Sequence, residues 1–279
     1  MNKRQFTALL MMLASVLMFN TTVNSATDPK KSGLFSAPAS SIDQASPYEA
    51  SFLVKVKGPG TCSGSPIKGT NLVITAAHCV MEPGTGAIGG RYDLRVEHEG
   101  TRFDVVEAYV DMQVAALPHP EDDVAILVLD RQIPGADLEI APFFDGKLDT
   151  KLIGYQPSTG RGSWLRGKDY ASHSDSLPMS FVTRPAVCKV PAGTARWVKD
   201  PGIWSVPCGL VPGASGGPLV AIIDGKSALV GVASTVNKSL THNGIAPLAK
   251  VHELLKNGDK YRQPVDGPSH SWGISGGQR

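Results

Sequence analysis

The sequence predicts an all-β protein of two antiparallel β-barrels with one helix at the C-terminal end. Short apolar runs alternate with segments that carry many of the 30 glycines and 21 prolines. A two-residue hairpin signal stands late in the chain, and one segment has convincing helical spacing. With 279 residues, of which 42% are hydrophobic, the chain can bury a full core. Many short strands with a terminal helix are typical of a double β-barrel.

The first half of the chain contains four strand-forming segments. Segment 49–57 alternates partly between polar and apolar side chains, and segment 71–76 is apolar. Segment 92–106 predicts two strands that turn near Glu99-Gly100, and 123–129 predicts a buried strand. We therefore expect an N-terminal barrel over about 47–140.

The second half follows a stretch with proline and glycine, 132–146, that links the two halves. Segment 151–156 predicts its first strand. Segments 218–223 and 226–233 flank Asp224-Gly225, a dipeptide typical of two-residue hairpin loops. We expect a C-terminal barrel over about 148–256, so that one domain covers 47–256.

A helix is predicted at the end of this domain. Leu248, Val251, Leu254 and Leu255 recur at helical spacing, and Asn257-Gly258 supplies a stop signal. The remaining segment is polar and rich in glycine. We expect a flexible tail over 257–279.

The N-terminal segment has the pattern of a secretory signal peptide. Lys3 and Arg4 precede an almost unbroken apolar stretch over 6–19, and small residues then permit cleavage after Ser25 or Ala26. We expect a signal peptide over 1–25 and a leader or short propeptide over 26–46, where Ser, Ala, Lys and Pro predominate. The mature protein would be secreted, in an extracellular or periplasmic location. An uncleaved membrane anchor is the alternative.

Composition limits the classes of partner and cofactor. The 27 basic and 25 acidic residues are interspersed and leave a net charge of +2, which gives no basic patch for nucleic acid. In an oxidising compartment the four cysteines, Cys62, Cys79, Cys188 and Cys208, favour disulfides, with three connectivities open. The seven histidines lack zinc-ligand spacing. We expect no metal and no cofactor.

Three separated residues have the chemistry of a catalytic triad. His78 in Thr75-Ala76-Ala77-His78-Cys79 supplies a base, Asp123 a group that orients it, and Ser215 in a glycine-rich turn the nucleophile. Asp122 is an alternative to Asp123, which directly precedes the apolar strand. The chain order His, Asp, Ser distinguishes this arrangement from the two other well-known triad folds.

The chain resembles the trypsin/chymotrypsin-like serine protease superfamily, in its secreted bacterial-type branch. The resemblance rests on 75–79, on Asp123 with the apolar run after it, and on 213–219, and it extends loosely over 46–255. It implies a chymotrypsin-like fold and a secreted serine endopeptidase that forms an acyl-enzyme. It also implies a Cys62–Cys79 disulfide, which leaves Cys188 to pair with Cys208. We expect a monomer with protein or peptide substrates, and no membrane contact after signal cleavage.

The serine motif itself carries one departure from this family. The glycines allow a substrate carbonyl to approach the backbone, so the N–H groups of Gly213 and Ser215 would form the oxyanion hole. Ala214 stands where trypsin-like enzymes usually have an aspartate that captures the new N-terminal ammonium. We therefore expect activity that does not depend on that capture.

The resemblance also suggests which residues line the substrate pocket. Gly209 takes the position of the aspartate that recognises Lys or Arg in trypsin-type enzymes. Ser234 to Val236 resembles the strand that pairs with substrate backbone, and Gly244 would line the pocket, which Val236 would narrow. Ala233 replaces a histidine of several glutamate-specific relatives. We expect a small or medium apolar side chain before the scissile bond.

Two other functions remain open from the sequence. A secreted binding protein or adhesin could use the same fold with vestigial chemistry, although such proteins usually lose a triad residue and none is missing here. An envelope-anchored protease is the lesser variant. The hypothesis that the residues favour is a secreted serine endopeptidase.

Overall fold

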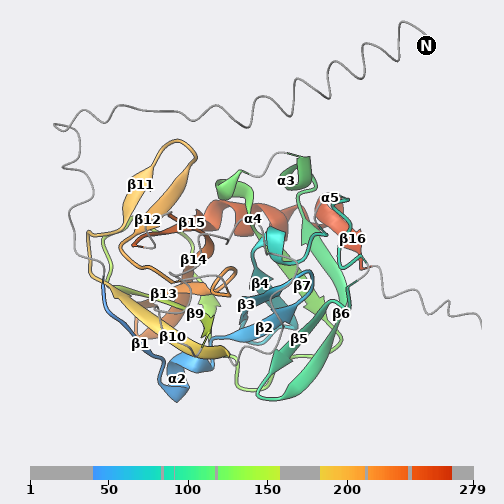
Figure 1. Ribbon diagram of the computed structural model, residues 1–279, viewed down its shortest axis with the longest axis horizontal. Coiled ribbons are helices and arrows are strands. Elements are labelled where there is room, and N and C mark those ends of the chain that lie inside the picture. Colours follow the sequence, from blue (N-terminus) through green and yellow to red (C-terminus); the bar gives the residue numbers. More distant parts are fainter. Residues whose placement is uncertain are drawn as a thin grey trace, which may run out of the picture. The chain divides into compact units, whose positions relative to one another are not determined.

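Two sheets form the body of the protein in a computed structural model that describes residues 40–82, 85–90, 92–116, 119–157, 183–210, 213–237 and 241–265 (Figure 1). The expected signal peptide, most of the expected leader and the last part of the expected tail lie outside the described residues. No helix within the described ranges is long and apolar enough to span a membrane.

The first sheet is a closed barrel. Its members run in the order β16, β6, β5, β2, β3, β4, β7, and β6 also pairs with β7, which closes the ring. Inward side chains of these strands form one apolar cluster. The strands are β2 (Val54–Lys57), β3 (Thr61–Pro66), β4 (Leu72–Thr75), β5 (Arg95–His98), β6 (Thr101–Val110), β7 (Ala125–Leu129) and β16 (Arg262–Pro264).

The second sheet is an open half-barrel among the described residues, with the order β1, β10, β9, β13, β14, β15, β12, β11 and with β8 parallel to β14. Its apolar faces form a second cluster. The strands are β1 (Ile42–Gln44), β8 (Glu139–Ile140), β9 (Thr150–Pro157), β10 (Thr183–Val190), β11 (Arg196–Val198), β12 (Ile203–Val206), β13 (Pro218–Ile223), β14 (Lys226–Val236) and β15 (Asn243–Pro247).

Among the described residues the helices are few and short, and the longest of them closes the domain. α4 (Leu248–Lys256) contacts β6 and β7 of the barrel and β14 and β15 of the second sheet. Its apolar stripe, Leu248, Val251 and Leu254, is buried. The other helices are α2 (Pro47–Ala50), α3 (Gln113–Ala116) and α5 (Gly258–Tyr261), and there are 3-10 turns at Ala77–Cys79 and Pro120–Asp122.

This architecture confirms the predicted all-β fold with a C-terminal helix. The predicted turn at Glu99-Gly100 joins β5 and β6, and Asp224-Gly225 joins β13 and β14, with Asp224 and Gly225 both at positive φ. The linking stretch 132–146 leads from β7 in the barrel to β9 in the second sheet, and it contributes β8 on the way.

Parts of the expected leader and of the expected flexible tail are folded where the structure describes them. β1 lies within the expected leader and pairs with β10, and α5 and β16 lie within the expected tail, where β16 pairs with β6. In Figure 1 the blue β1 lies beside β10, and the red β16 lies beside the green β6. Three-residue edge strands have too little sequence pattern to be predicted, and the sheet edge that they cover decides their conformation.

The start of the domain also differs from the prediction. Residues 47–50 form α2, where the sequence pattern predicted a strand from Glu49. Ser46 and Glu49 form a capping box and Pro47 occupies the first turn, which together favour a helix start. Glu49 then pairs with Lys151 of β9 at 2.7 Å, so the turn is attached to the second sheet.

Candidate active site

His78 and Asp123 lie together because the strands that carry them are paired. His78 belongs to the 3-10 turn directly after β4, Asp123 stands just before β7, and Thr75 of β4 pairs with Ala125 of β7. The Nδ1 atom of His78 lies 2.8 Å from Oδ2 of Asp123, and the His78 backbone N–H donates to Oδ1 at 3.0 Å. Strand pairing and two hydrogen bonds therefore hold one imidazole in one orientation.

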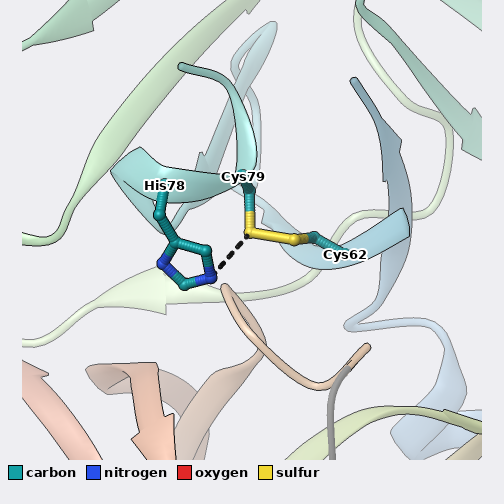
Figure 2. A group of neighbouring side chains, drawn as sticks. All are labelled: Cys62, His78 and Cys79. Atoms are coloured by element: carbon teal, nitrogen blue, oxygen red, sulfur yellow. Dashed lines mark hydrogen bonds between the residues drawn. A yellow bond between two sulfur atoms is a disulfide. The ribbon is translucent and has the colours of Figure 1, made fainter. Parts of the chain in front are cut away.

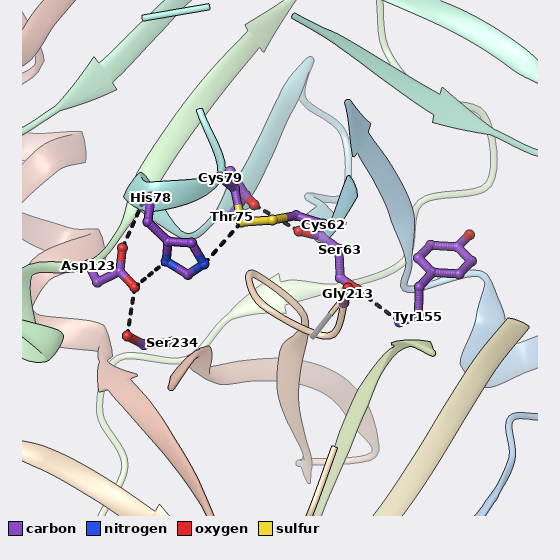
Figure 3. The surroundings of a disulfide bond; sticks show 9 residues. All are labelled: Cys62, Ser63, Thr75, His78, Cys79, Asp123, Tyr155, Gly213 and Ser234. Atoms are coloured by element: carbon purple, nitrogen blue, oxygen red, sulfur yellow. Dashed lines mark hydrogen bonds and ion pairs between the residues drawn. A yellow bond between two sulfur atoms is a disulfide. The ribbon is translucent and has the colours of Figure 1, made fainter. Parts of the chain in front are cut away.

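The aspartate is buried and the histidine is open to solvent. Asp123 is 6% exposed, whereas the His78 side chain is 47% exposed, so a substrate can reach the ring. The Ser234 hydroxyl from β14 donates to Oδ2 of Asp123 at 2.6 Å, so three donors satisfy this buried carboxylate (Figure 3). A buried, fully bonded carboxylate can stabilise positive charge on the imidazole.

The pKa directions of the pair agree with this geometry. Partial removal of the His78 ring from water opposes its charge, but the hydrogen bond and charge of Asp123 outweigh this and raise the pKa of His78 above its ordinary value. Burial would raise the pKa of Asp123, but the bonds from His78 and Ser234 lower it. The aspartate is therefore the ionised member, and Nδ1 of the histidine carries the proton that it accepts.

The neighbouring Asp122 has a different partner. It pairs with Lys250 of α4 at 3.1 Å, and the same ammonium contacts Asp111 at 2.7 Å and Glu253 at 3.2 Å. Lys250 is 6% exposed, and these carboxylates raise its pKa despite its burial. Of the two adjacent aspartates, Asp123 contacts the histidine and Asp122 connects the loop to α4.

The glycine-rich turn around Ser215 packs against the strands of the barrel. The backbone N–H of Ser63 in β3 donates to the Ser215 carbonyl at 2.8 Å. A Cβ at Gly216 would collide with the Ser63 carbonyl and with Oγ1 of Thr75, and the φ of Gly216 is +80°. Glycine is therefore required for the turn to lie this close to the end of β4, three residues before His78.

The structure brings Ser215 to the same end of the barrel as His78 but does not join the two side chains. Among the described residues no hydrogen bond links Ser215 to Nε2 of His78. Instead Nε2 lies 3.7 Å from Sγ of Cys79 (Figure 2). Catalytic hydrogen bonds are often long before substrate binds.

Both disulfides of the structure have the pairing that the resemblance implies. Cys62 of β3 is bonded to Cys79, and Cys188 of β10 is bonded to Cys208. Cys62, Cys79 and His78 place possible metal-ligand atoms within 4.8 Å of one another. The two sulfurs are bonded to each other, however, and a thiolate is the form of cysteine that binds metal, so this group is not a metal site.

Of the expected pocket residues, Ser234 and Val236 lie in β14 and Gly244 in β15, whereas Gly209 lies in the loop between β12 and the serine turn. Gly209 is buried next to Cys208, and Val236 pairs with Asn243 across β14 and β15. Gly244 is confined, because a Cβ there would meet Oγ1 of Thr235. Ser234 uses its hydroxyl on Asp123, as described above, so it supports the histidine pair directly.

Two residues that sequence reasoning missed hold the segment before the serine. The Asn243 side chain is buried, accepts from the Leu210 N–H at 2.9 Å and donates to the Leu210 carbonyl at 2.9 Å. The Ser63 hydroxyl donates to the Gly213 carbonyl at 2.7 Å. Neither residue has a local sequence signal, because each acts on a segment far away in the chain.

A family model for the trypsin-like peptidase domain matches residues 62–232. The chain belongs to this family of serine proteases, whose fold implies peptide or protein substrates. No curated protein matches the chain.

Solved structures with the same fold have low sequence identity to the chain. AL20, a thermostable serine protease from an extremophilic microorganism, is 18% identical with a TM-score of 0.55 over 74% of this chain and 96% of its own. A Glu endopeptidase is 16% identical with a TM-score of 0.54, over 80% and 97%. A mutant of human heparin binding protein is 17% identical with a TM-score of 0.52, over 82% and 100%. These likenesses concern the fold alone.

Proposed function

We propose that the protein is a secreted serine endopeptidase that cleaves peptide bonds through an acyl-enzyme, with His78, Asp123 and Ser215 as its triad. The observation that carries the proposal is the His78–Asp123 pair, hydrogen-bonded at 2.8 Å beside a serine turn that requires glycine. Membership of the trypsin-like peptidase family supports it. The two disulfides and the signal-like N-terminal segment support secretion.

The chemistry follows from the roles of the three groups. Nε2 of His78 takes the hydroxyl proton of Ser215 as Oγ attacks the substrate carbonyl carbon, and Asp123 stabilises the imidazolium. The N–H groups of Gly213 and Ser215 bind the developing oxyanion, a contribution of about 3 to 4 kcal/mol per donor. The C–N bond breaks as His78 returns the proton to the leaving amine. Water, deprotonated by His78, then attacks the ester carbonyl, and Ser215 leaves with the proton.

This mechanism requires His78 to turn toward Ser215 in the substrate complex. The imidazole is 47% exposed, so a small rotation that keeps its Nδ1 bond to Asp123 is sufficient. We therefore propose that the contact between Nε2 and the Cys79 sulfur is exchanged for a hydrogen bond to Oγ of Ser215 when a substrate binds.

Ala214 supports an activation route different from that of trypsin-like zymogens. The side chain is 2% exposed, and a Cβ added at Gly154 of β9 would lie only 2.6 Å from the Cβ of Ala214. This tight, apolar contact holds the turn without an ammonium. We propose that activity does not depend on one defined N-terminal residue. Preparations that begin at different residues before Ser40 should turn over substrate equally, and activity confined to a single start would overturn this point.

We propose that the enzyme prefers substrates with a small or medium apolar side chain on the residue before the scissile bond. Gly209 offers no charge for Lys or Arg, and Val236 narrows the expected pocket. A peptide library digested with the purified protein should yield cleavage after such residues. A profile dominated by Arg, Lys or Glu would contradict the proposal.

A fluorophosphonate probe tests the proposed function directly. Wild-type protein should be labelled at Ser215, located by mass spectrometry, and His78→Ala and Ser215→Ala should not be labelled. His252→Ala is the matched control, because this imidazole bonds the Ala141 carbonyl from α4 and takes no part in the site. A folded wild-type protein that resists the probe would favour the alternative, a vestigial binding protein.

A further inference from the structure

We propose that Ser63 is a positioning residue for the oxyanion hole, one whose hydroxyl and backbone N–H hold the two peptide planes on either side of the plane that carries the Ser215 N–H. This inference rests on the proposed function. Ser63 lies in β3 of the barrel, whereas the serine turn leads into β13 of the second sheet. Figure 3 shows its side chain between Gly213 and Tyr155, on the other side of the Cys62–Cys79 disulfide from His78.

Ser63 holds the serine turn at two points. Its hydroxyl donates to the Gly213 carbonyl at 2.7 Å, and its backbone N–H donates to the Ser215 carbonyl at 2.8 Å. Its own carbonyl accepts from Oγ1 of Thr75 at 2.7 Å. One residue therefore fixes both ends of the tripeptide that contains the two expected oxyanion donors.

The direction of the Ser63 hydroxyl is also determined. The Tyr155 N–H of β9 donates to Oγ of Ser63 at 2.9 Å, so the oxygen is an acceptor on that side. A hydroxyl has one proton, and here the proton points to the Gly213 carbonyl, which can only accept. Ser63 is fully buried, so water does not compete for these bonds.

Fixing the Gly213 carbonyl fixes the Gly213–Ala214 peptide plane, and fixing the Ser215 carbonyl fixes the Ser215–Gly216 plane, so the Ala214–Ser215 plane with its Ser215 N–H lies between two fixed planes. Gly213 has a φ of +107°, in a region where glycine moves freely and no side chain limits the backbone. Ala214 has no polar side-chain atom that could anchor the turn. Within the turn the Gly217 N–H bonds the Ala214 carbonyl, and the Ser63 hydroxyl adds a restraint from a different strand that helps hold the Ser215 N–H in place before the oxyanion forms.

Ser65 offers a matched control on the same strand. It lies two residues further along β3 and therefore on the same side of the strand. It is also fully buried, but its hydroxyl has no hydrogen-bond partner within the described part of the chain. Ser65→Ala and Ser63→Ala thus remove the same atom from comparable surroundings, and only the second breaks the bond to the turn.

The test measures steady-state kinetics and probe labelling of the full chain. Ser63→Ala should lower kcat by about 10- to 100-fold with KM changed less than about twofold, because an oxyanion donor acts in the transition state. The rate at which the fluorophosphonate probe labels Ser215 should fall by a similar factor. A peptide aldehyde, whose adduct places an oxygen in the hole, should bind more weakly by that factor, while the apparent pKa of His78 in the rate profile stays unchanged.

Ser65→Ala should keep kcat within about twofold of wild type, which separates positioning from general packing. Ser63→Gly removes the hydroxyl together with the Cβ, and it replaces Ser63→Ala if that variant does not fold. The proposal is overturned if a folded Ser63 variant keeps wild-type kcat, or if Ser65→Ala loses as much. Wild-type protein that the probe does not label would instead refute the proposed function, so the two failures are distinguishable.

Discussion

The two halves of the candidate site are held by different kinds of interaction. On one side His78 and Asp123 lie at the adjacent ends of two paired strands of the barrel, β4 and β7, and are joined through ionisable side chains. On the other side the turn around Ser215 contributes no ionisable group and is held through backbone atoms, close glycine packing and the Ser63 hydroxyl.

This difference separates two kinds of experimental effect. Changes in the histidine half should alter the protonation state of the base and hence the pH dependence of catalysis. Changes in the serine half should alter the geometry of the nucleophile and its donors, and lower kcat at every pH. A serine-half variant that shifts the pH dependence of catalysis would argue against independent halves.

Asp123→Asn should have the largest effect. The amide removes the charge and presents a donor where Nδ1–H needs an acceptor, so the imidazole adopts the wrong tautomer. We expect kcat to fall by about 10⁴-fold, as in other triads with this change. Asp122→Asn is the control, because Asp122 pairs with Lys250, and it should keep most of the activity. Equal losses in the two variants would contradict the assignment of Asp123.

Gly216→Ala should have the next largest effect, and it tests the serine half. The new Cβ would meet the Ser63 carbonyl and Thr75, and the positive φ adds strain of about 1 to 3 kcal/mol. Displacing the nucleophile by about 1 Å costs on the order of 100-fold in rate. Gly225→Ala is the control. Gly225 has a similar φ of +76°, but a Cβ added there would have no other atom within 4 Å, so this variant should show the effect of backbone strain alone. Kinetics and urea unfolding of both variants make the comparison.

Lys250→Met tests the connection between α4 and the aspartate loop. Losing the ammonium removes bonds to Asp111 and Asp122, which should cost about 1 to 3 kcal/mol of unfolding free energy and only a few-fold of activity. Lys256→Met, an exposed position on the same helix, is the control.

The loss of unfolding free energy in Lys250→Met should depend on pH in a predictable direction. Burial would raise the pKa of Asp111, but the bond from Lys250 lowers it. The pKa of Asp111 is therefore lower in the folded state than in the unfolded state. The ion pair adds to the free energy of unfolding at pH values above the unfolded-state pKa, and this contribution is lost as the pH falls through the folded-state pKa. The difference between wild type and Lys250→Met should therefore be largest near neutral pH and shrink in acid. A constant difference across this range would contradict the ion-pair explanation.

The smallest expected effect concerns the pH at which kcat/KM rises to half its maximum. Because Asp123 raises the pKa of His78, kcat/KM should rise with pH through an apparent pKa above the ordinary value of about 6.5. The raised pKa of His78 also contributes to the free energy of unfolding. This contribution is present while His78 is protonated and is lost as the pH rises through its folded-state pKa. A midpoint below the ordinary value, measured by probe labelling, would be inconsistent with the pair.

Much of the fold was predictable because its signals are local. The hairpin at Asp224-Gly225 needs positive φ at both residues, and α4 needs apolar side chains at helical spacing, so a short window contains the information. The edge strands β1 and β16 were not predictable. Each is three residues long, and the hydrogen bonds that form it come from β10 and β6.

The candidate site divides in the same way. His78, Asp123 and Ser215 stand in recognisable motifs because a base, an acceptor and a nucleophile must be particular residue types. The sequence alone also determined that Ala214 could not supply an ion pair, and that the serine turn needs glycine. The choice of Asp123 over Asp122 as the partner of His78 depended on which carboxylate faces the ring and which faces Lys250.

Only the tertiary structure decided which residues support the site. Ser63, Ser234 and Asn243 are small polar residues without local pattern, and each bonds a group far away in the chain. Their roles depend on the register of strands that pair across long sequence separations and on which side of each strand a side chain faces. The chemistry was therefore determined by residue identity, whereas its positioning was determined by packing.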